Sequence, residues 1–260
     1  MRLIANLSML FTELPLLERI EAARLAGFDA VEIQFPYEVS PLRLQQELNA
    51  QEMPLVLFNV PAGDLLAGGP GFACQPKLQR KFAEALDTAL EYAAIAKPEK
   101  VNVLAGRLLP EQDSEQAFMT LATNLREAAR AFSRLHIQVL VEAINPLDMP
   151  GFFLQTPCQQ LDLLREVKQP NCKAQLDIYH MARQGIDPLA AITQLGDAIG
   201  HVQFADCPGR NEPGSGALDF VAIRQQLQQI GYNDGWAAEY RPQADTVAGL
   251  SWMSGPAFLR

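Results

Sequence analysis

The sequence predicts an α/β protein built as a single-domain (β/α)8 TIM barrel that spans residues 1–260. Three observations support this prediction. Short apolar runs suited to buried strands occur eight times, and stretches with helical periodicity separate them. Eight strand-plus-helix units of about 32 residues each fill the chain, and eight such units close a barrel. No shift in composition and no low-complexity linker marks a second domain.

The eight apolar runs are expected to be parallel strands, because strands that alternate with helices form parallel sheets. They cover residues 3–7, 30–35, 55–60, 100–105, 138–144, 173–178, 200–205 and 236–240. An open, doubly wound sheet is the alternative architecture. Such a sheet usually carries a nucleotide-binding loop, and neither G-x-G-x-x-G nor G-x-x-x-x-G-K-[ST] follows any of these runs.

Apolar residues at steps of three and four predict helices between the runs. Two clear cases extend from Phe118 to Leu135 and from Phe220 to Ile230. Gly27 and Gly231 each follow such a stretch and are expected to end a helix. After the last run, the tail at 241–260 is expected to hold one short helix and an irregular end.

Composition excludes several classes of partner. The chain has 30 acidic and 21 basic residues, a net charge of -9 and no run of Lys or Arg, which disfavours a nucleic acid. No stretch of about 18 apolar residues predicts a membrane span. The four cysteines form no C-x-x-C pair and indicate free thiols in a reducing compartment, so we expect a cytoplasmic protein without a signal peptide. A homo-oligomer is compatible with the sequence.

Four polar residues lie near the ends of the last four predicted strands: Glu142, Asp177, Gln203 and Glu239. Apolar neighbours flank each of them, so strand alternation points all four into the barrel. Adjacent strands lie about 4.8 Å apart, so the four side chains should converge on one small volume. This volume is at the C-terminal rim, where barrel enzymes keep their active sites.

Three carboxylates in one apolar-walled cavity need a compensating charge, and these strands carry no inward Lys or Arg. A divalent cation would supply that charge. The donors are all oxygen atoms, which favours Mg²⁺ or Mn²⁺ over zinc. The alternative is that each residue is an isolated, hydrogen-bonded strand residue; four such residues at matching levels argue against it.

Other polar residues near this rim are candidates for substrate binding. His180 follows Asp177 by three positions, and Arg210 lies in a loop rich in glycine and proline at 206–216. We expect both to contact an anionic substrate, with loop hydrogen bonding and turn formation as the alternatives. Glu212, in the same loop, is a candidate to orient Arg210 or another ligand.

Further polar residues are expected inside the barrel or at strand ends. His201 lies two positions before Gln203 and is interpreted as a buried histidine that supports the site from behind. Glu32 points inward by alternation and is interpreted as non-catalytic. Asn6 and Asn59 are strand-end candidates to line the pocket, with structural roles as the alternative.

An ordered set of short motifs resembles the hydroxypyruvate isomerase family, which belongs to the xylose-isomerase-like barrels. The motifs lie at residues 6–11, 35–37, 141–145, 176–181, 200–206 and 239–242. The resemblance covers nearly the whole chain. It implies a divalent metal held by Glu142, Asp177, Gln203 and Glu239, with the two glutamates as the acid/base pair.

The resemblance also implies a reaction, an intramolecular oxidoreduction that interconverts aldose and ketose forms. The first candidate is hydroxypyruvate to 2-hydroxy-3-oxopropanoate, and the alternative substrate is a 2-oxo-tetronate. Both need a proton moved between adjacent carbons through an enediolate, whose charge a chelated cation stabilises. Glu142 and Glu239, on the fifth and eighth strands, are expected to face each other as base and acid. Two departures from the family pattern bear on the choice of substrate. Asn211 stands where the family usually has histidine, and the loop at 62–71 lacks the Trp or Arg that is often found there.

Three other functions are weighed against this one. Ketose 3-epimerases of the same superfamily generally have histidine where Gln203 stands. A phosphodiesterase of the endonuclease IV type needs a zinc cluster with many histidines, and this chain has three. A non-catalytic sugar-acid binding protein would not need two facing glutamates.

Overall fold

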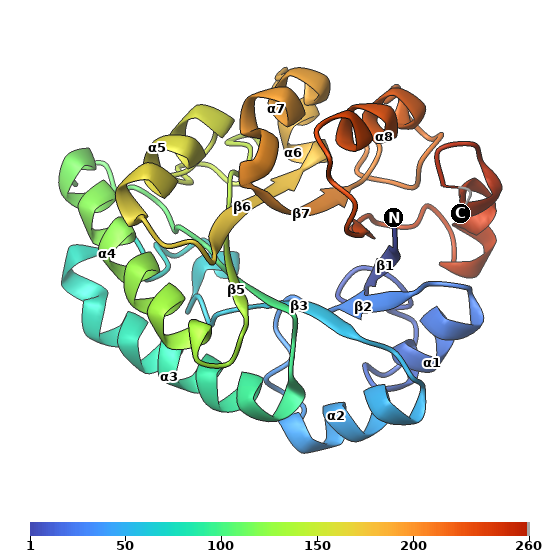
Figure 1. Cartoon of the computed structure of the whole chain (residues 1–260), viewed down its shortest axis with the longest axis horizontal. Coiled ribbons are helices and arrows are strands. Elements are labelled where there is room, and N and C mark those ends of the chain that lie inside the picture. The colour runs from blue at the N-terminus through green and yellow to red at the C-terminus, as the bar shows by residue number, and fades with distance from the viewer. Residues whose placement is uncertain (259–260) are drawn as a thin grey trace.

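Residues 1–258, the part of the chain that the structure describes, form a closed barrel of eight parallel strands in this computed structural model. Each strand pairs with the next along the chain, and β8 pairs with β1. The strands form the inner ring and the helices the outer ring (Figure 1). The predicted (β/α)8 barrel is therefore confirmed. Residues 259–260 of the predicted domain lie outside the described residues.

All eight strands fall on the expected apolar runs. Their bounds are β1 Leu3–Asn6, β2 Ala30–Glu32, β3 Leu55–Asn59, β4 Lys100–Val103, β5 Gln138–Glu142, β6 Cys172–Asp177, β7 Ile199–Phe204 and β8 Trp236–Ala238. The last strand is shorter than expected, so Glu239 follows β8 instead of lying within it. The N–H of Glu239 still bonds to the Phe204 carbonyl of β7 at 3.0 Å, and the N–H of Arg241 bonds to the carbonyl of Arg210, in the loop after β7, at 2.8 Å.

The helices also follow the predicted pattern, with one addition. They are α1 Glu18–Leu25, α2 Pro41–Ala50, α3 Gln79–Ala96, α4 Ser114–Ser133, α5 Pro157–Val167, α6 Ile178–Arg183, α7 Pro188–Leu195 and α8 Phe220–Gln229, with 3-10 turns η1 Leu65–Ala67, η2 Pro76–Leu78, η3 Gly196–Ala198 and η4 Val247–Ser254. Gly27 and Gly231 follow helices with φ of +93° and +79°, as expected of helix-ending glycines. η4 is the predicted short helix of the tail. Within residues 1–258, no helix is long and apolar enough to cross a membrane.

The addition is a second helix between β6 and β7. Asp177 ends β6 and caps α6 immediately, because its carboxylate accepts the N–H of Tyr179. Gly185, at φ +81°, then turns the chain, and Asp187 caps α7. The strand residue Asp177 thus becomes a helix cap at the rim of the barrel.

An ion pair between a buried lysine and a half-exposed aspartate lies at the N-terminal end of the barrel. The Lys100 ammonium, with its side chain 6% exposed, lies 2.6 Å from the Asp234 carboxylate and donates to the Gly200 carbonyl at 2.8 Å. Arg2 pairs with the same carboxylate and with Glu99. Burial alone would raise the pKa of Asp234, but the Lys100 and Arg2 charges outweigh it and hold that pKa below its usual range.

Asp234→Asn is expected to lower the free energy of unfolding by about 2 kcal/mol at pH 7, because the buried Lys100 ammonium loses a charged hydrogen-bond partner that is itself partly screened by solvent. Glu99→Gln, which breaks a half-exposed pair with Arg2, is the control and should cost less than about 1 kcal/mol. Because the folded pKa of Asp234 lies below the unfolded one, the effect should shrink as the pH falls below the usual carboxyl range. Urea unfolding at two pH values measures the loss of stability and its dependence on pH. Equal urea midpoints for wild type and Asp234→Asn at pH 7 would contradict a stabilising role for this ion pair.

Candidate active site

A cavity of about 800 Å³ opens at the C-terminal ends of the strands, a size within the range of small-molecule sites. Three of the four predicted rim residues line it: Glu142, Gln203 and Glu239. The fourth, Asp177, lies beside them and contacts the lining residues His180 and Arg210. The structure thus places all four at one end of the barrel.

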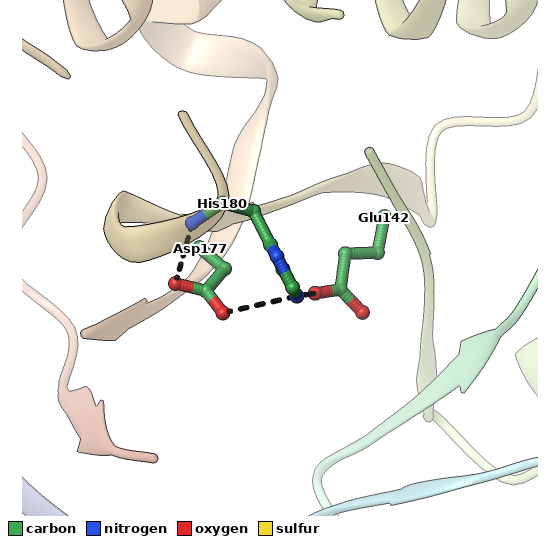
Figure 2. Close-up of side chains that lie close together, drawn as sticks. All are labelled: Glu142, Asp177 and His180. Carbon is green, nitrogen blue, oxygen red and sulfur yellow. Dashed lines mark hydrogen bonds and ion pairs between the residues drawn. The ribbon is translucent and has the colours of Figure 1, made fainter. Parts of the chain in front are cut away.

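Two of the carboxylates and one imidazole form a tight group. Glu142 ends β5, Asp177 ends β6 and His180 lies in the first turn of α6, and their potential ligand atoms all lie within 4.8 Å of one another. The His180 imidazole lies between the two carboxylates (Figure 2), with Nε2 at 3.5 Å from Asp177 Oδ2 and 3.8 Å from Glu142 Oε1. The cap on α6 explains this placement, because Asp177 Oδ1 holds the backbone of the turn that carries His180.

The hydrogen bonds of Asn145 determine what the His180 ring offers. Asn145 Oδ1 accepts the N–H groups of Leu147 and Asp148, so its Nδ2 faces His180 Nδ1 at 2.6 Å and donates to it. In a neutral imidazole the proton is then on Nε2, the atom that faces the carboxylates. Burial lowers the pKa of His180 to about 4, which keeps the ring neutral at pH 7. His180 is therefore a hydrogen-bond donor to the cavity and not a ligand for a cation.

Arg210 supplies a positive charge beside the carboxylates at the rim. Its Nη2 lies 2.7 Å from Glu239 Oε2 and 3.4 Å from Asp177 Oδ2, and its guanidinium lies over the Tyr179 ring at 5.1 Å. The backbone at Arg210 has φ +56°, a strained conformation of the kind found at functional sites. Its Nε is buried and has no hydrogen-bond partner among the described residues.

The site keeps a negative charge after this pairing. Glu142, Asp177 and Glu239 carry three negative charges when ionised, and Arg210 carries one positive charge, which leaves two negative charges in a buried space. Burial, followed by the charges of Glu239 and Asp177, raises the pKa of Glu142 well above its usual range. Burial also raises the pKa of Glu239 to about 7, although Arg210 opposes the shift. A divalent cation would balance this charge, and the oxygen donors fit a hard one.

A hydrogen-bonded layer lies behind these residues. Gln203 accepts from Gln175 Nε2 at 2.6 Å and donates to Glu32 Oε1 at 2.7 Å. Asn6 Nδ2 donates to Glu32 Oε1 at 2.8 Å and to Glu239 Oε1 at 3.0 Å. His201 Nε2 lies 2.7 Å from Glu32 Oε2. His201 is thus buried behind the site as expected, whereas Asn6 and Glu32 support the pocket from below.

Of two other predicted residues, Asn59 reaches the cavity that the described residues form and Glu212 does not. Asn59 lines the cavity. Glu212 is not brought to the cavity lining within residues 1–258: its carboxylate accepts the N–H of Gln243 at 3.1 Å. The expectation that Glu212 orients Arg210 therefore finds no contact in the described structure, because the loop turns its side chain toward the segment after β8.

Several amide side chains of the site were not predicted. Gln34 Nε2 donates to Glu239 at 2.7 Å, and Asn102 Nδ2 donates to Glu142 at 3.2 Å. Gln175 binds Gln203, as described above. Asn102 and Gln175 lie within strands, so the same inward alternation that identified Glu142 could have found them. Gln34 lies two residues after the inward Glu32 in the expected run at 30–35, so alternation could have found it as well, although β2 itself ends at Glu32.

Comparison with known proteins shows the family of the chain. Residues 20–255 match the family described as "Xylose isomerase-like TIM barrel". Hydroxypyruvate isomerase of Escherichia coli (strain K12) is 40% identical, with 97% of this chain and 98% of that protein covered. A 2-oxo-tetronate isomerase of Cupriavidus necator is 38% identical, with 97% of each chain covered.

Solved structures show the same fold. One described as AP endonuclease, family 2, from Brucella melitensis superposes with a TM-score of 0.93 at 34% identity, over 98% of both chains. D-psicose 3-epimerase from Clostridium cellulolyticum H10 superposes with a TM-score of 0.77 at 18% identity, over 96% of this chain and 89% of that one. The second similarity is one of fold alone.

Proposed function

Because the chain belongs to the xylose isomerase-like TIM barrel family and its isomerase relatives match over nearly their whole length, we propose that it is a divalent-metal-dependent isomerase of a small hydroxy-oxo acid. The reaction we favour is hydroxypyruvate to 2-hydroxy-3-oxopropanoate. A 2-oxo-tetronate is the second candidate substrate, because a relative of that name is almost as similar. The observation that carries the proposal is the group of three buried carboxylates with one arginine at the barrel rim.

The residues present fit a metal ion. Glu142, Asp177, Gln203 and Glu239 would hold it through oxygen atoms, which suits Mg²⁺ or Mn²⁺. When bound, such an ion would balance the charge of the ionised carboxylates and stabilise charge that develops on the substrate oxygens. His180 would not hold it, because its Nε2 carries the ring proton.

The chain's own residues would move the proton. One of the two glutamates, Glu142 or Glu239, would take a proton from the carbon that bears the hydroxyl group, and a proton would be returned to the neighbouring carbonyl carbon. The hydroxyl oxygen then becomes the new carbonyl oxygen, and the old carbonyl oxygen gains a proton. His180 Nε2–H would donate to a substrate oxygen, and the guanidinium of Arg210, which lines the cavity, would bind the anionic substrate.

A substrate panel tests this assignment. With Mg²⁺ or Mn²⁺ present, we expect hydroxypyruvate or a 2-oxo-tetronate to be isomerised with a kcat/KM at least about 10²-fold above that for a ketohexose, since the ketohexose lacks the carboxylate that Arg210 would bind. Conversion is followed by proton NMR. Faster epimerisation of the ketohexose would contradict the proposal and favour the 3-epimerase alternative.

A further inference from the structure

We propose that Glu32 is a positioning residue that determines which end of the Gln203 amide faces the cavity. This inference rests on the proposed function, because it concerns the carbonyl oxygen that Gln203 would offer to the cation. Glu32 itself does not line the cavity in the described structure and touches no reacting atom.

The contacts of Glu32 come from two other strands, β1 and β7. Its side chain lies at the end of β2 and is completely buried. Oε1 receives Gln203 Nε2 from β7 and Asn6 Nδ2 from β1, at 2.7 and 2.8 Å. Oε2 lies 2.7 Å from His201 Nε2. An ionised carboxylate only accepts hydrogen bonds, so each of these neighbours must present an N–H to it.

This requirement sets the direction of the Gln203 amide. The two ends of a glutamine amide have nearly the same shape but opposite hydrogen-bonding roles. Since Glu32 takes the NH₂ end, the carbonyl oxygen must lie on the other side, where Gln175 donates to it at 2.6 Å. That oxygen has a second lone pair for a cation. A reversed amide would set oxygen against the Glu32 carboxylate and NH₂ toward the cation, and both contacts would be repulsive.

Glu32 acts on a second proposed ligand through Asn6. The Asn6 NH₂ group bridges Glu32 Oε1 and Glu239 Oε1. Since Asn6 Oδ1 accepts the N–H of Ser8 at 3.0 Å, the direction of this amide is also determined. One buried carboxylate thus orients an amide ligand directly and contacts a carboxylate ligand through one side chain.

The first test is Glu32→Gln, which keeps the volume but introduces a donor. Binding of Mn²⁺ alone, measured by calorimetry without substrate, is expected to weaken about 10-fold or more, because outer partners of metal ligands contribute about 10- to 100-fold in affinity. Glu111→Gln, an exposed glutamate, is the matched control and should bind Mn²⁺ like wild type. Circular dichroism verifies that each variant is folded.

The second test asks whether the effect of Glu32→Gln on Mn²⁺ affinity reverses when residue 203 is changed. In a Gln203→Glu background, residue 203 has no NH₂ end to orient, and it faces Glu32 as a second carboxylate. Adding Glu32→Gln there should strengthen Mn²⁺ binding, although the same change weakens it in wild type. If Gln203→Glu alone does not fold, recovery of a folded, Mn²⁺-binding protein in the double variant is the expected result.

The outcomes separate this inference from the proposed function. If wild type does not bind Mn²⁺, the proposed function fails. If wild type binds Mn²⁺ and Glu32→Gln binds it equally well, the positioning role is wrong while the metal site stands. A weakening by Glu32→Gln in both backgrounds would also overturn the positioning role, because it is the result expected of a merely structural residue.

Discussion

Replacing Glu142 by glutamine is expected to lower turnover by at least about 10²-fold, and Glu239→Gln should do the same. Glutamine keeps an oxygen ligand and almost the same volume but cannot accept the proton, and general acid–base catalysis contributes about 10²- to 10⁴-fold. The structure makes Glu142→Gln the cleaner variant. Glu239 also pairs with Arg210 at 2.7 Å, so Glu239→Gln weakens the partner of a buried guanidinium and should cost stability as well.

The double variant and a control sharpen this prediction. Glu142→Gln with Glu239→Gln should lose much less than the product of the two single effects, because residues that act as a unit are not additive. Exposed Glu111→Gln should turn over like wild type. Turnover near the wild-type value in both single variants, with metal bound, would show that the two-carboxylate mechanism is wrong.

Removal of divalent metal is expected to have the largest effect of all, a complete loss of turnover. Without a cation, the raised pKa values of Glu142 and Glu239 favour their protonated forms, which cannot take a proton from the substrate, and the enediolate charge is left unstabilised. Mg²⁺ or Mn²⁺ added back to EDTA-treated protein should restore turnover. Full activity in protein shown by elemental analysis to be metal-free would contradict the proposed metal dependence.

The variant Asp177→Asn tests whether Asp177 is one of the metal ligands. Asparagine still caps α6, so the helix should remain, but it replaces the oxygen that faces His180 and Arg210 by an NH₂ group. We expect weaker Mn²⁺ binding in a folded protein. An unchanged Mn²⁺ titration would remove Asp177 from the ligand set.

Strand residues of the site were predictable because alternation with a period of two determines which side chains face inward. Glu142, Asp177 and Gln203 lie in strands, and the structure places them at the rim as expected. The same rule gave the buried position of His201. Because the sheet closes into a barrel, the inward face of every strand points to the same interior, so the sequence pattern of a strand also gives the place of its side chains.

Loop residues were less predictable because no periodicity governs them. Arg210 was expected to bind substrate, but its pairing with Glu239 and Asp177 depends on the path of the loop after β7. Asp206 determines that path by accepting the N–H groups of Gly214, Gly216 and Leu218. The backbone of Asp206 also bonds to the Arg210 N–H and the Asn211 carbonyl, which closes the turn that carries Arg210, whereas the Glu212 carboxylate bonds to the segment after β8.

Exchange of the substrate proton with solvent tests the central claim most directly. Metal-loaded protein is incubated with hydroxypyruvate in deuterated water, and proton NMR follows the hydrogens on the hydroxyl-bearing carbon and in the product. The proposed mechanism predicts deuterium at the carbon that gives up its proton or at the carbon that receives one, with both exchange and product lost in metal-free protein and in Glu142→Gln. Exchange that continues unchanged in Glu142→Gln and in metal-free protein would contradict a metal-dependent, two-carboxylate isomerase.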